Sequence, residues 1–451
     1  MATLIIWLIV SIGALLFLVL KWKVNASIAL IVASLIMGIG TGLPLLNVIE
    51  GISEGFGSFM KGSGLPIGFG IILGQLVYDY GGANAIARGI LKAFPKQKAL
   101  YALALASFII SIPVFFDITF VLLIPLGIAM AHEIKKPLPY VVCALVAGGV
   151  ITHTLVPPTP APLAAAHILK FDVGLMILAG SIIGLIAAMA GMTFMFKLLD
   201  RGLWKPETDE ADTAHDVTLD EPLCADRPTP GLFVSMVPIL VPVVLILINT
   251  FYGMAVGPEN IPLAVTFLGD KTISMLLGTV AAMIIALKNL SLKEIDISAN
   301  NSLKSAGVVL LVTGAGGAFG KILAMSGLGD AITDGISAIS AGPATVMIIT
   351  FLIAMLLRVA QGSATVAGIT TLNILAPAMA SLPLHPLWVA VAGMAGAFSV
   401  GHVNDSGFWI MVNRSNFSVK GGLKVITLTE LVCSLVILAC AVVAGSILPT
   451  F

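Results

Sequence analysis

The chain has 451 residues, of which 58% are hydrophobic and only 10% are charged, with 23 basic and 23 acidic side chains. A soluble domain carries about 25% charged residues, so this composition excludes an ordinary soluble protein and predicts one solvated by lipid. The net charge of zero argues against a nucleic-acid partner. No paired spacing relates the four cysteines, which argues against a disulfide framework, a metal site or a metal cofactor; they are Cys143, Cys224, Cys433 and Cys440.

Apolar runs of about 18 to 25 residues recur along the whole chain, each long enough to cross a bilayer. Because the bilayer core holds no water to bond an open backbone, these runs must be helices. The first run, 2–20, follows no basic residue and contains no small-residue cleavage site. We therefore expect a retained helix there rather than a cleaved signal peptide.

The order of the crossings follows from the lysines and arginines, which mark cytoplasmic loops. Lys21 follows the first helix and places the N-terminus outside. A second helix at about 25–43 returns to the outer face, so we expect an external loop that carries Glu50 and Glu54. The glycine-rich segment 66–91 then crosses inward.

The next two clusters of lysines both mark the inner face, and they flank about 35 apolar residues. Two helical arms of that length would each reach only about 25 Å, short of a 30 Å core. A re-entrant hairpin fits better than two full crossings, and its tip would hold Pro113 and Asp117. Segments 138–166 and 173–196 are then expected to cross outward and back.

The second half is predicted to begin inside and to contain two helices around an outer loop, an outward segment, a hairpin with uncharged flanks, a returning segment and a last helix. These elements are expected at 232–251, 273–287, 305–336, 343–382, 386–412 and 423–448.

The chain also repeats itself once. Within 71–90, Gly74 and Gly81 recur 246 residues later as Gly320 and Gly327. A very hydrophobic chain with one internal repeat and polar breaks in both copies is typical of a secondary transporter. Five crossings in each half would place the two copies in opposite orientations, since that number is odd.

We therefore predict an all-α polytopic membrane protein built as an inverted repeat of two halves. Each half has about five transmembrane helices, one re-entrant hairpin and one broken helix. The expected parts are an N-terminal half, 1–196, a polar, acidic cytoplasmic linker, 197–230, and a C-terminal half, 231–451.

Four polar stretches interrupt these elements and are expected to meet near the middle of the membrane. The hairpin tips read FFDITF and AQGSATVAG, and the broken segments read ITHTLVPPTPAP and FSVGHVNDSGF. Irregular backbone at that depth is tolerated only inside protein or along a cavity, and half-helix N-termini there attract an anion. The candidate substrate-binding residues are Thr119, Thr152, His153, Thr154, Thr159, Arg358, Gln361, Gly362, Ser363, Thr365, His402, Asn404 and Ser406.

Each charge in these stretches costs at least about 3 kcal/mol at mid-depth and therefore needs a reason. Arg358 is expected to attract a substrate carboxylate, and Asp117 and Asp405 are expected to carry a proton. The alternative is that Arg358 pairs with an aspartate as a buried structural bridge.

The other polar candidates also have two interpretations. His153 and His402 either shuttle protons and donate to a hydroxylated ligand, or bond a backbone carbonyl. The Ser and Thr hydroxyls either bind substrate or bond the preceding turn of their own helix. Four further polar residues in apolar surroundings are expected to have interface or structural roles, namely Gln75, Asp79, Lys321 and Glu430.

The stretches FFDITFVLLIPL, THTLVPPTPAP, LRVAQGSATVAGIT and GHVNDSGFW, together with YDYGGANAIA, resemble the gluconate permease family. That family consists of gluconate:proton symporters within the wider ion-transporter superfamily. The resemblance extends from about residue 65 to 420. It implies a proton-coupled importer of gluconate or a related sugar acid in the bacterial inner membrane, without a cofactor.

The superfamily resemblance also implies a homodimer with a scaffold and a moving transport domain. Asp117 at a hairpin tip, where the sodium-dependent dicarboxylate branch carries Ser-Asn-Thr, favours protons over sodium. Gluconate-type members often have Tyr-Glu or Asp-Val-Gly where this chain has Phe116-Asp117-Ile118-Thr119, so the substrate stays open.

Three alternatives remain at this stage. One is a sodium-coupled carboxylate transporter, and another is a proton symporter for a substrate like D-serine. An ion channel would also accommodate two hairpins that face opposite ways. An intramembrane enzyme is disfavoured because the sequence contains neither HExxH nor GxSxG.

Overall fold

A computed structural model of the chain describes residues 2–211, 228–329, 342–382 and 384–450. These residues form helices joined by short turns, and within them the only β-pairing is a single isolated bridge. Eight of the described helices are long and apolar enough to cross a membrane, or nine if a pair bent by 63° counts as one span. The protein is therefore an all-helical, multi-pass membrane protein, as predicted.

The first half of the described chain contains eleven α-helices, a π-helical segment η1 and a short 3-10 turn η2. They are α1 (Ala2–Leu20), α2 (Ala26–Gly40), α3 (Leu45–Phe59), η1 (Met60–Gly64), α4 (Leu65–Asp79), α5 (Gly82–Ala93), η2 (Lys96–Lys98), α6 (Ala99–Ile110), α7 (Phe116–Ile134), α8 (Leu138–Leu155), α9 (Pro160–Leu169), α10 (Val173–Asp200) and α11 (Pro206–Asp209).

The second half of the described chain continues the series. Its elements are α12 (Leu232–Val256), η3 (Pro258–Asn260), α13 (Leu263–Gly269), α14 (Lys271–Ala286), α15 (Leu292–Met325), α17 (Pro343–Gln361), α18 (Ala364–Leu375), η4 (Ala376–Ser381), α19 (Pro386–Phe398), α20 (Ser406–Arg414), α21 (Val419–Gly422), the π-helical η5 (Leu423–Thr427) and α22 (Leu428–Ile447).

Several expected boundaries change. The segment expected at 305–336 begins much earlier, because Ser291 caps α15 and forms a capping box with Glu294. The end of that segment, from 330, lies outside the described residues, and so do 212–227 of the predicted linker, with Cys224.

The prediction of an external loop with Glu50 and Glu54 is wrong, because both residues lie in α3. α3, η1 and α4 form one apolar span of 35 residues. Gly51 and Gly55, one turn apart, form part of a narrow buried face that packs against α15. Glu54 also forms an ion pair with Lys321 of α15, at 2.9 Å. α3 is therefore held in place by close packing and an ion pair with α15.

The helix bounds recur at the offset seen in the sequence. A shift of 246 residues would move α2 to 272–286, and α14 spans Lys271–Ala286. The same shift would move α3–α4 to 291–325, and α15 spans Leu292–Met325. The later elements also recur in the same order: each half has a helical hairpin, then a helix broken in the middle, then a long single helix.

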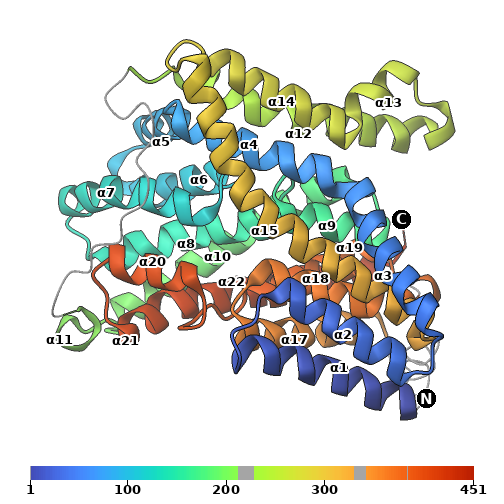
Figure 1. Ribbon diagram of the computed structural model, residues 1–451. Helices are drawn as coiled ribbons and strands as arrows, with labels where there is room; N and C mark the ends of the chain where they lie inside the picture. Colours follow the sequence, from blue (N-terminus) through green and yellow to red (C-terminus); the bar gives the residue numbers. More distant parts are fainter. Residues whose placement is uncertain (1, 212–227, 330–341, 383, 451) are drawn as a thin grey trace.

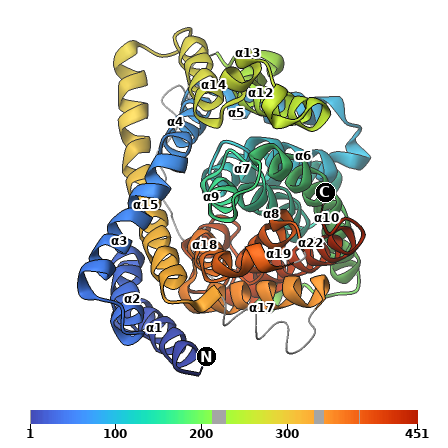
Figure 2. The same ribbon diagram turned by 90° about the vertical axis from the view of Figure 1, so that its right-hand side faces the viewer.

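The helices are arranged as a frame beside a bundle, as Figures 1 and 2 show. We define the frame as α1–α4 and α12–α15, in which α15 packs along α2, α3 and α4. The pairs α1–α2 and α12–α14 lie at its two ends. The bundle comprises α6–α10 and α17–α22, of which α20 and α21 are labelled in Figure 1.

Helices α8 and α19 pack against each other inside the bundle, and each also packs against a hairpin and a long single helix. Their sequences are almost entirely small or apolar, and nearly all of their residues are buried. The two hairpins are α6–α7 and α17–α18, and the two broken helices are α8–α9 and α19–α20. The bundle therefore holds all four polar stretches picked out in the sequence.

We predict that Gly55→Ala destabilises the protein, because a Cβ at that position would lie 2.5 Å from the carbonyl oxygen of Gly317 on α15. Such overpacking costs about 1–3 kcal/mol, so the apparent melting temperature of the detergent-solubilised protein should fall. The matched control is Gly57→Ala in the same helix, where a Cβ meets nothing within 4 Å. Equal melting temperatures for the two variants would contradict this packing.

Candidate functional site

Four helices begin at the polar stretches within the bundle. α7 starts after the hairpin turn 111–115, and α18 starts after Gly362 and Ser363. α9 starts after the break 156–159, and α20 starts after the break 399–405. α7 packs against α20, and α9 packs against α18, so each hairpin arm meets the broken helix of the other half. Their N-termini present backbone N–H groups and positive dipole ends.

Arg358 lies in the last turn of α17 with only 3% of its surface exposed. Its guanidinium donates to the carbonyl oxygen of Gly362 and forms an ion pair with Asp405. Asp405 also caps α20 by accepting a hydrogen bond from the Gly407 N–H at 2.9 Å. The structure thus contains the buried ion pair between Arg358 and an aspartate that the sequence analysis gave as an alternative. Arg358 Nε has no hydrogen-bond partner among the described residues.

The tip of the second hairpin lies directly against the second break. Gly362 has a left-handed φ of +79°, and a Cβ there would collide with the carbonyl oxygen of Asn404. Asn404 Nδ2 donates to the Val359 carbonyl at 2.7 Å, and His402 Nε2 lies 3.2 Å from the same oxygen. His402 therefore bonds a backbone carbonyl, which is the structural alternative foreseen for it.

Asp117 joins this cluster from the other half of the chain. It lies in the first turn of α7, and a Cβ on Gly407 would lie 2.9 Å from its Oδ1. The same Cβ would lie 3.4 Å from Oδ1 of Asp405. Both aspartate side chains therefore lie close to the N-terminus of α20. The absence of a Cβ at Gly407 provides the space for the Asp117 carboxyl.

A fourth charged residue of this region is Glu430, for which the sequence predicts an interface or structural role. Glu430 of α22 is 2% exposed, and its Oε2 accepts a hydrogen bond from the N–H of Gly401 at 2.7 Å. A Cβ on Gly401 would lie 2.6 Å from Nη2 of Arg358 and against Glu430. The signal for this residue was present, since a carboxyl inside an apolar run is itself a functional indication.

Most of the predicted hydroxyl ligands are engaged locally. Thr152, Thr154 and Thr159 donate to carbonyls three or four residues earlier, at 2.8–2.9 Å. Ser363 caps α18 by accepting from Val366 N at 3.3 Å. The three threonines thus have the structural role foreseen as the alternative. Thr365 is half-buried and Ser406 is exposed.

Besides Arg358, three predicted residues keep buried polar atoms without a hydrogen-bond partner among the described residues. They are Thr119 Oγ1, His153 Nδ1 and both amide atoms of Gln361. The His153 ring packs against Phe115 at the first hairpin tip, with 5.2 Å between centroids. Since buried polar groups are rarely left unpaired, these atoms could bind a polar ligand.

The structure therefore brings together Asp117, Arg358, Gly362, Asn404 and Asp405. Among the described residues, the hydrogen bonds of Thr152, Thr154 and Thr159 stay within the first break and α8, and the His153 ring packs against Phe115, so none of these candidates contacts the charged cluster. The described residues contain no group of three or more His, Cys, Asp or Glu side chains that could hold a metal ion.

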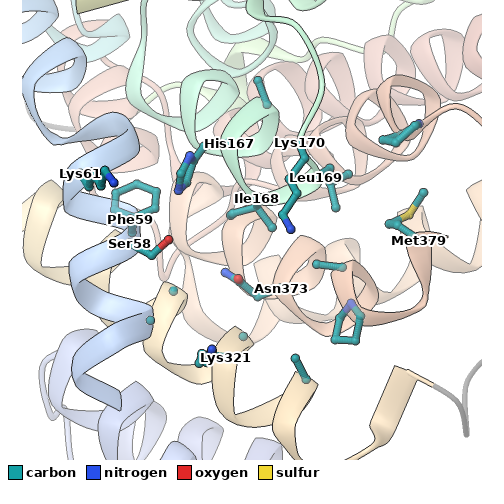
Figure 3. A pocket seen from close by; sticks show the side chains of 18 of the residues that line it. Ser58, Phe59, Lys61, His167, Ile168, Leu169, Lys170, Lys321, Asn373 and Met379 are labelled. Atoms are coloured by element: carbon teal, nitrogen blue, oxygen red, sulfur yellow. The ribbon is translucent and has the colours of Figure 1, made fainter. Parts of the chain in front are cut away.

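A large cavity lies elsewhere, between the frame and the bundle, and has a volume of about 1240 Å³. None of the predicted site residues lines it. Figure 3 shows Lys61, His167, Lys170, Lys321 and Asn373 around it. We place the candidate binding site at the charged cluster instead, because buried ionisable groups in a membrane protein require a functional or pairing reason.

Comparison with known proteins gives a consistent result. The family model described as GntP family permease matches residues 3–447. The chain is 34% identical to the gluconate permease of Pseudomonas aeruginosa, over 95% of this chain and 94% of that protein. It is 32% identical to the high-affinity gluconate transporter of Escherichia coli, over 94% of this chain and 96% of that protein.

Two solved structures share the fold at low sequence identity. The YdaH transporter of Alcanivorax borkumensis has a TM-score of 0.61 and 15% identity, with 90% of each chain covered. MtrF of Neisseria gonorrhoeae has a TM-score of 0.64 and 15% identity, with 92% of this chain and 93% of that chain covered. Both likenesses concern the fold alone.

Proposed function

Because the chain belongs to the GntP family of permeases, and is thus a membrane transporter rather than an enzyme, we propose that it imports gluconate or a related sugar acid together with protons. Relatives named as gluconate permeases, and one named as an L-idonate transporter of Escherichia coli, support this substrate class. A relative named as an inner membrane permease supports the bacterial inner membrane as its location.

The observation that carries the proposal is the buried Arg358 at the meeting point of a hairpin tip and a broken helix. A guanidinium offers paired N–H donors that match a carboxylate, and here it is held by the Gly362 carbonyl and by Asp405. Its Nε has no partner among the described residues, so the side chain retains capacity for a second anion. A substrate carboxylate would bind there, beside the N-terminus of α20.

The hydroxyl groups of a sugar acid would be bound by the polar atoms around this cluster. Thr119 and Gln361 have unpaired buried atoms at the two hairpin tips. Thr365, Asn404 and Ser406 lie in or beside the same turns with partly or fully exposed side chains. Such a set provides both donors and acceptors, which a polyol requires.

The first experiment measures coupling in proteoliposomes. We expect gluconate to accumulate when the outside is acid, and to stop accumulating when an ionophore collapses the pH gradient. Replacement of sodium by choline at constant pH should leave uptake unchanged. Sodium dependence would instead support the carboxylate:sodium alternative, and accumulation of D-serine rather than gluconate would support the amino-acid alternative.

We predict that Arg358→Gln raises the KM for gluconate at least about tenfold, since a charge-assisted hydrogen bond contributes about 1.5–3 kcal/mol. Arg358→Lys should recover only part of this loss, because an ammonium lacks the planar fork. The control is Arg88→Gln, which removes an exposed guanidinium of α5 outside the cluster. A wild-type KM in folded Arg358→Gln would disprove the assigned role.

We further propose that the two halves, 1–196 and 231–451, form an inverted repeat joined by the linker 197–230. The recurrence of helix bounds supports the repeat, and the placement of lysines supports the opposite orientations. The packing pattern agrees, because the contact of α7 with α20 corresponds under the repeat to that of α18 with α9. A homodimer is proposed from the family resemblance.

The contacts between frame and bundle support alternating access by a sliding bundle. On α4, a Cβ at Gly70 would lie 3.1 Å from the carbonyl oxygen of Pro158. Gly74, one turn further, lies against the carbonyl oxygen of Pro113. In the first half, therefore, the frame touches the break and the hairpin tip themselves.

The equivalent positions in the second half touch a different level of the bundle. Gly316 of α15 faces Ile369, with its Cβ position 2.9 Å from Cγ2, and Gly320 lies against Asn373. These partners are six and ten residues beyond Ser363, well away from the tip. The two halves of the bundle thus meet the frame at levels that differ by about 9–15 Å, at 1.5 Å per residue.

We infer that the bundle is displaced along the frame, towards the inner face by the lysine-based topology. When the bundle is displaced towards the outer face instead, the two halves should exchange their contacts with the frame. Gly70 should then face Leu123, which is the repeat equivalent of Ile369. This exchange is what elevator-like alternating access requires.

Cysteine pairs test the exchange in a background without the four native cysteines. Gly316→Cys with Ile369→Cys should form a disulfide in the arrangement seen here and block transport until it is reduced. Gly70→Cys with Leu123→Cys should form one only in the opposite arrangement, with more product in excess external substrate. Failure of the second pair to form during active transport would exclude the sliding motion.

The lysine-lined cavity lies on the outer side in this topology. Four lysines line it, and among its described lining residues Glu54 is the one carboxylate, paired with Lys321. A positively charged mouth raises the local concentration of an anion. It would therefore favour approach of a sugar acid from outside.

A further inference from the structure

Glu430 is held in place by the backbone of the second break. Its Oε2 accepts the N–H of Gly401 at 2.7 Å, and Thr427 Oγ1, from the preceding turn, donates to the carbonyl oxygen of Gly401. The junction of η5 and α22 therefore bonds both the N–H and the carbonyl of one residue in the break. Thr427 ends the π-helical segment η5, a local widening that is frequent at functional sites.

Gly401 also brings Glu430 next to Arg358. A side chain at position 401 would meet Oε2 of Glu430 and Nη2 of Arg358 on the same side. The guanidinium therefore lies within reach of two carboxyls, Asp405 in a direct ion pair and Glu430 across Gly401.

The charges of this cluster do not balance. Arg358 is the cation that acts on Glu430 among the described residues, whereas Asp405 and Asp117 both add negative charge. Lys424 of η5 lies six residues before Glu430 but pairs with Asp209 at 2.6 Å. One guanidinium can offset one buried carboxylate, and a second buried carboxylate without a counter-ion is strongly disfavoured.

The other titratable groups near Glu430 do not change this balance. Cys433 lies one turn further along α22, and Cys143 of α8 interacts with it. Both thiols are buried and neither supplies a positive charge. With three carboxyls and one guanidinium, the cluster is therefore more stable when at least one of its carboxyls is protonated.

We propose that Glu430 is the binding site of the transported proton, an inference that rests on the proposed proton-coupled function. Asp405 is engaged in the ion pair, and Asp117 lies half-buried at the hairpin tip. Of the three carboxyls in the cluster, Glu430 is the one that is fully buried, and the N–H of Gly401 fixes the position of its Oε2 beside Arg358.

The proton on Glu430 controls the charge available to the substrate. With Glu430 neutral, Arg358 can bind a substrate carboxylate in addition to Asp405. When the carboxyl O–H bond breaks on the inner side, the proton leaves to water and the new carboxylate competes for Nη2 of Arg358. Release of the proton thereby weakens substrate binding, which couples the two fluxes.

The test separates coupling from binding in proteoliposomes. Glu430→Gln imitates the protonated carboxyl, so we expect gluconate exchange across the membrane to remain within about threefold of wild type. Accumulation driven by a pH gradient should fall at least tenfold, and exchange should lose its dependence on pH. The control is Glu50→Gln, an exposed carboxyl of α3 outside the cluster, which should keep both activities.

Two outcomes would overturn the proposal: wild-type accumulation by Glu430→Gln, or loss of exchange in a variant with an unchanged melting temperature. If Glu430→Gln does not fold, Glu430→Asp carries the test. It withdraws the carboxyl by one methylene and should shift the pH of half-maximal uptake while exchange persists; an unshifted profile would refute the assignment. A wild-type protein that shows no pH-driven uptake would instead refute the proposed function itself.

Discussion

A backbone that leaves its helix inside a bilayer must find its hydrogen-bond partners within the protein, because lipid supplies none. This constraint places both hairpin tips and both broken helices in the bundle. The break at 399–405 shows how it is met. Gly401 is bonded by Thr427 at the end of η5 and by Glu430 of α22, while Asn404 donates to the Val359 carbonyl and Asp405 caps α20. We propose that the polar groups that satisfy the break also bind the substrate.

The hydrogen bonds that satisfy the hairpin tip and this break also bury charged side chains, which need counter-ions. Arg358 satisfies the carbonyl oxygen of Gly362 at the end of its helix and in doing so becomes a buried cation. Its counter-ion Asp405 is the cap of the next half-helix. In the function that we propose, stability and transport depend on one network, in which a bound carboxylate or a proton changes how a single positive charge is shared.

The sequence located the breaks well but not every partner. Pro113, Pro157-Pro158 and the Gly-Ser of the second tip interrupt apolar runs, and such residues predict a break wherever they occur. Glu50 and Glu54 were misplaced in a loop because the partner of α3 is α15, more than 240 residues away. The role of Glu430 depends on the tertiary contact with Gly401, and no local pattern shows which face of α22 is polar. The sequence likewise allowed Thr152 and Thr154 either to bind substrate or to bond the preceding turn of their own helix, and the helix geometry shows the second kind of bond.

The most direct test of the account is a structure of the protein determined with gluconate at acid pH. We expect the substrate carboxylate against the guanidinium of Arg358, between Gly362 and the N-terminus of α20, with its hydroxyls towards Thr119, Gln361 or Asn404. Density for the substrate at a site remote from Arg358, with the Arg358–Asp405 pair unchanged and enclosed by protein, would contradict the central claim.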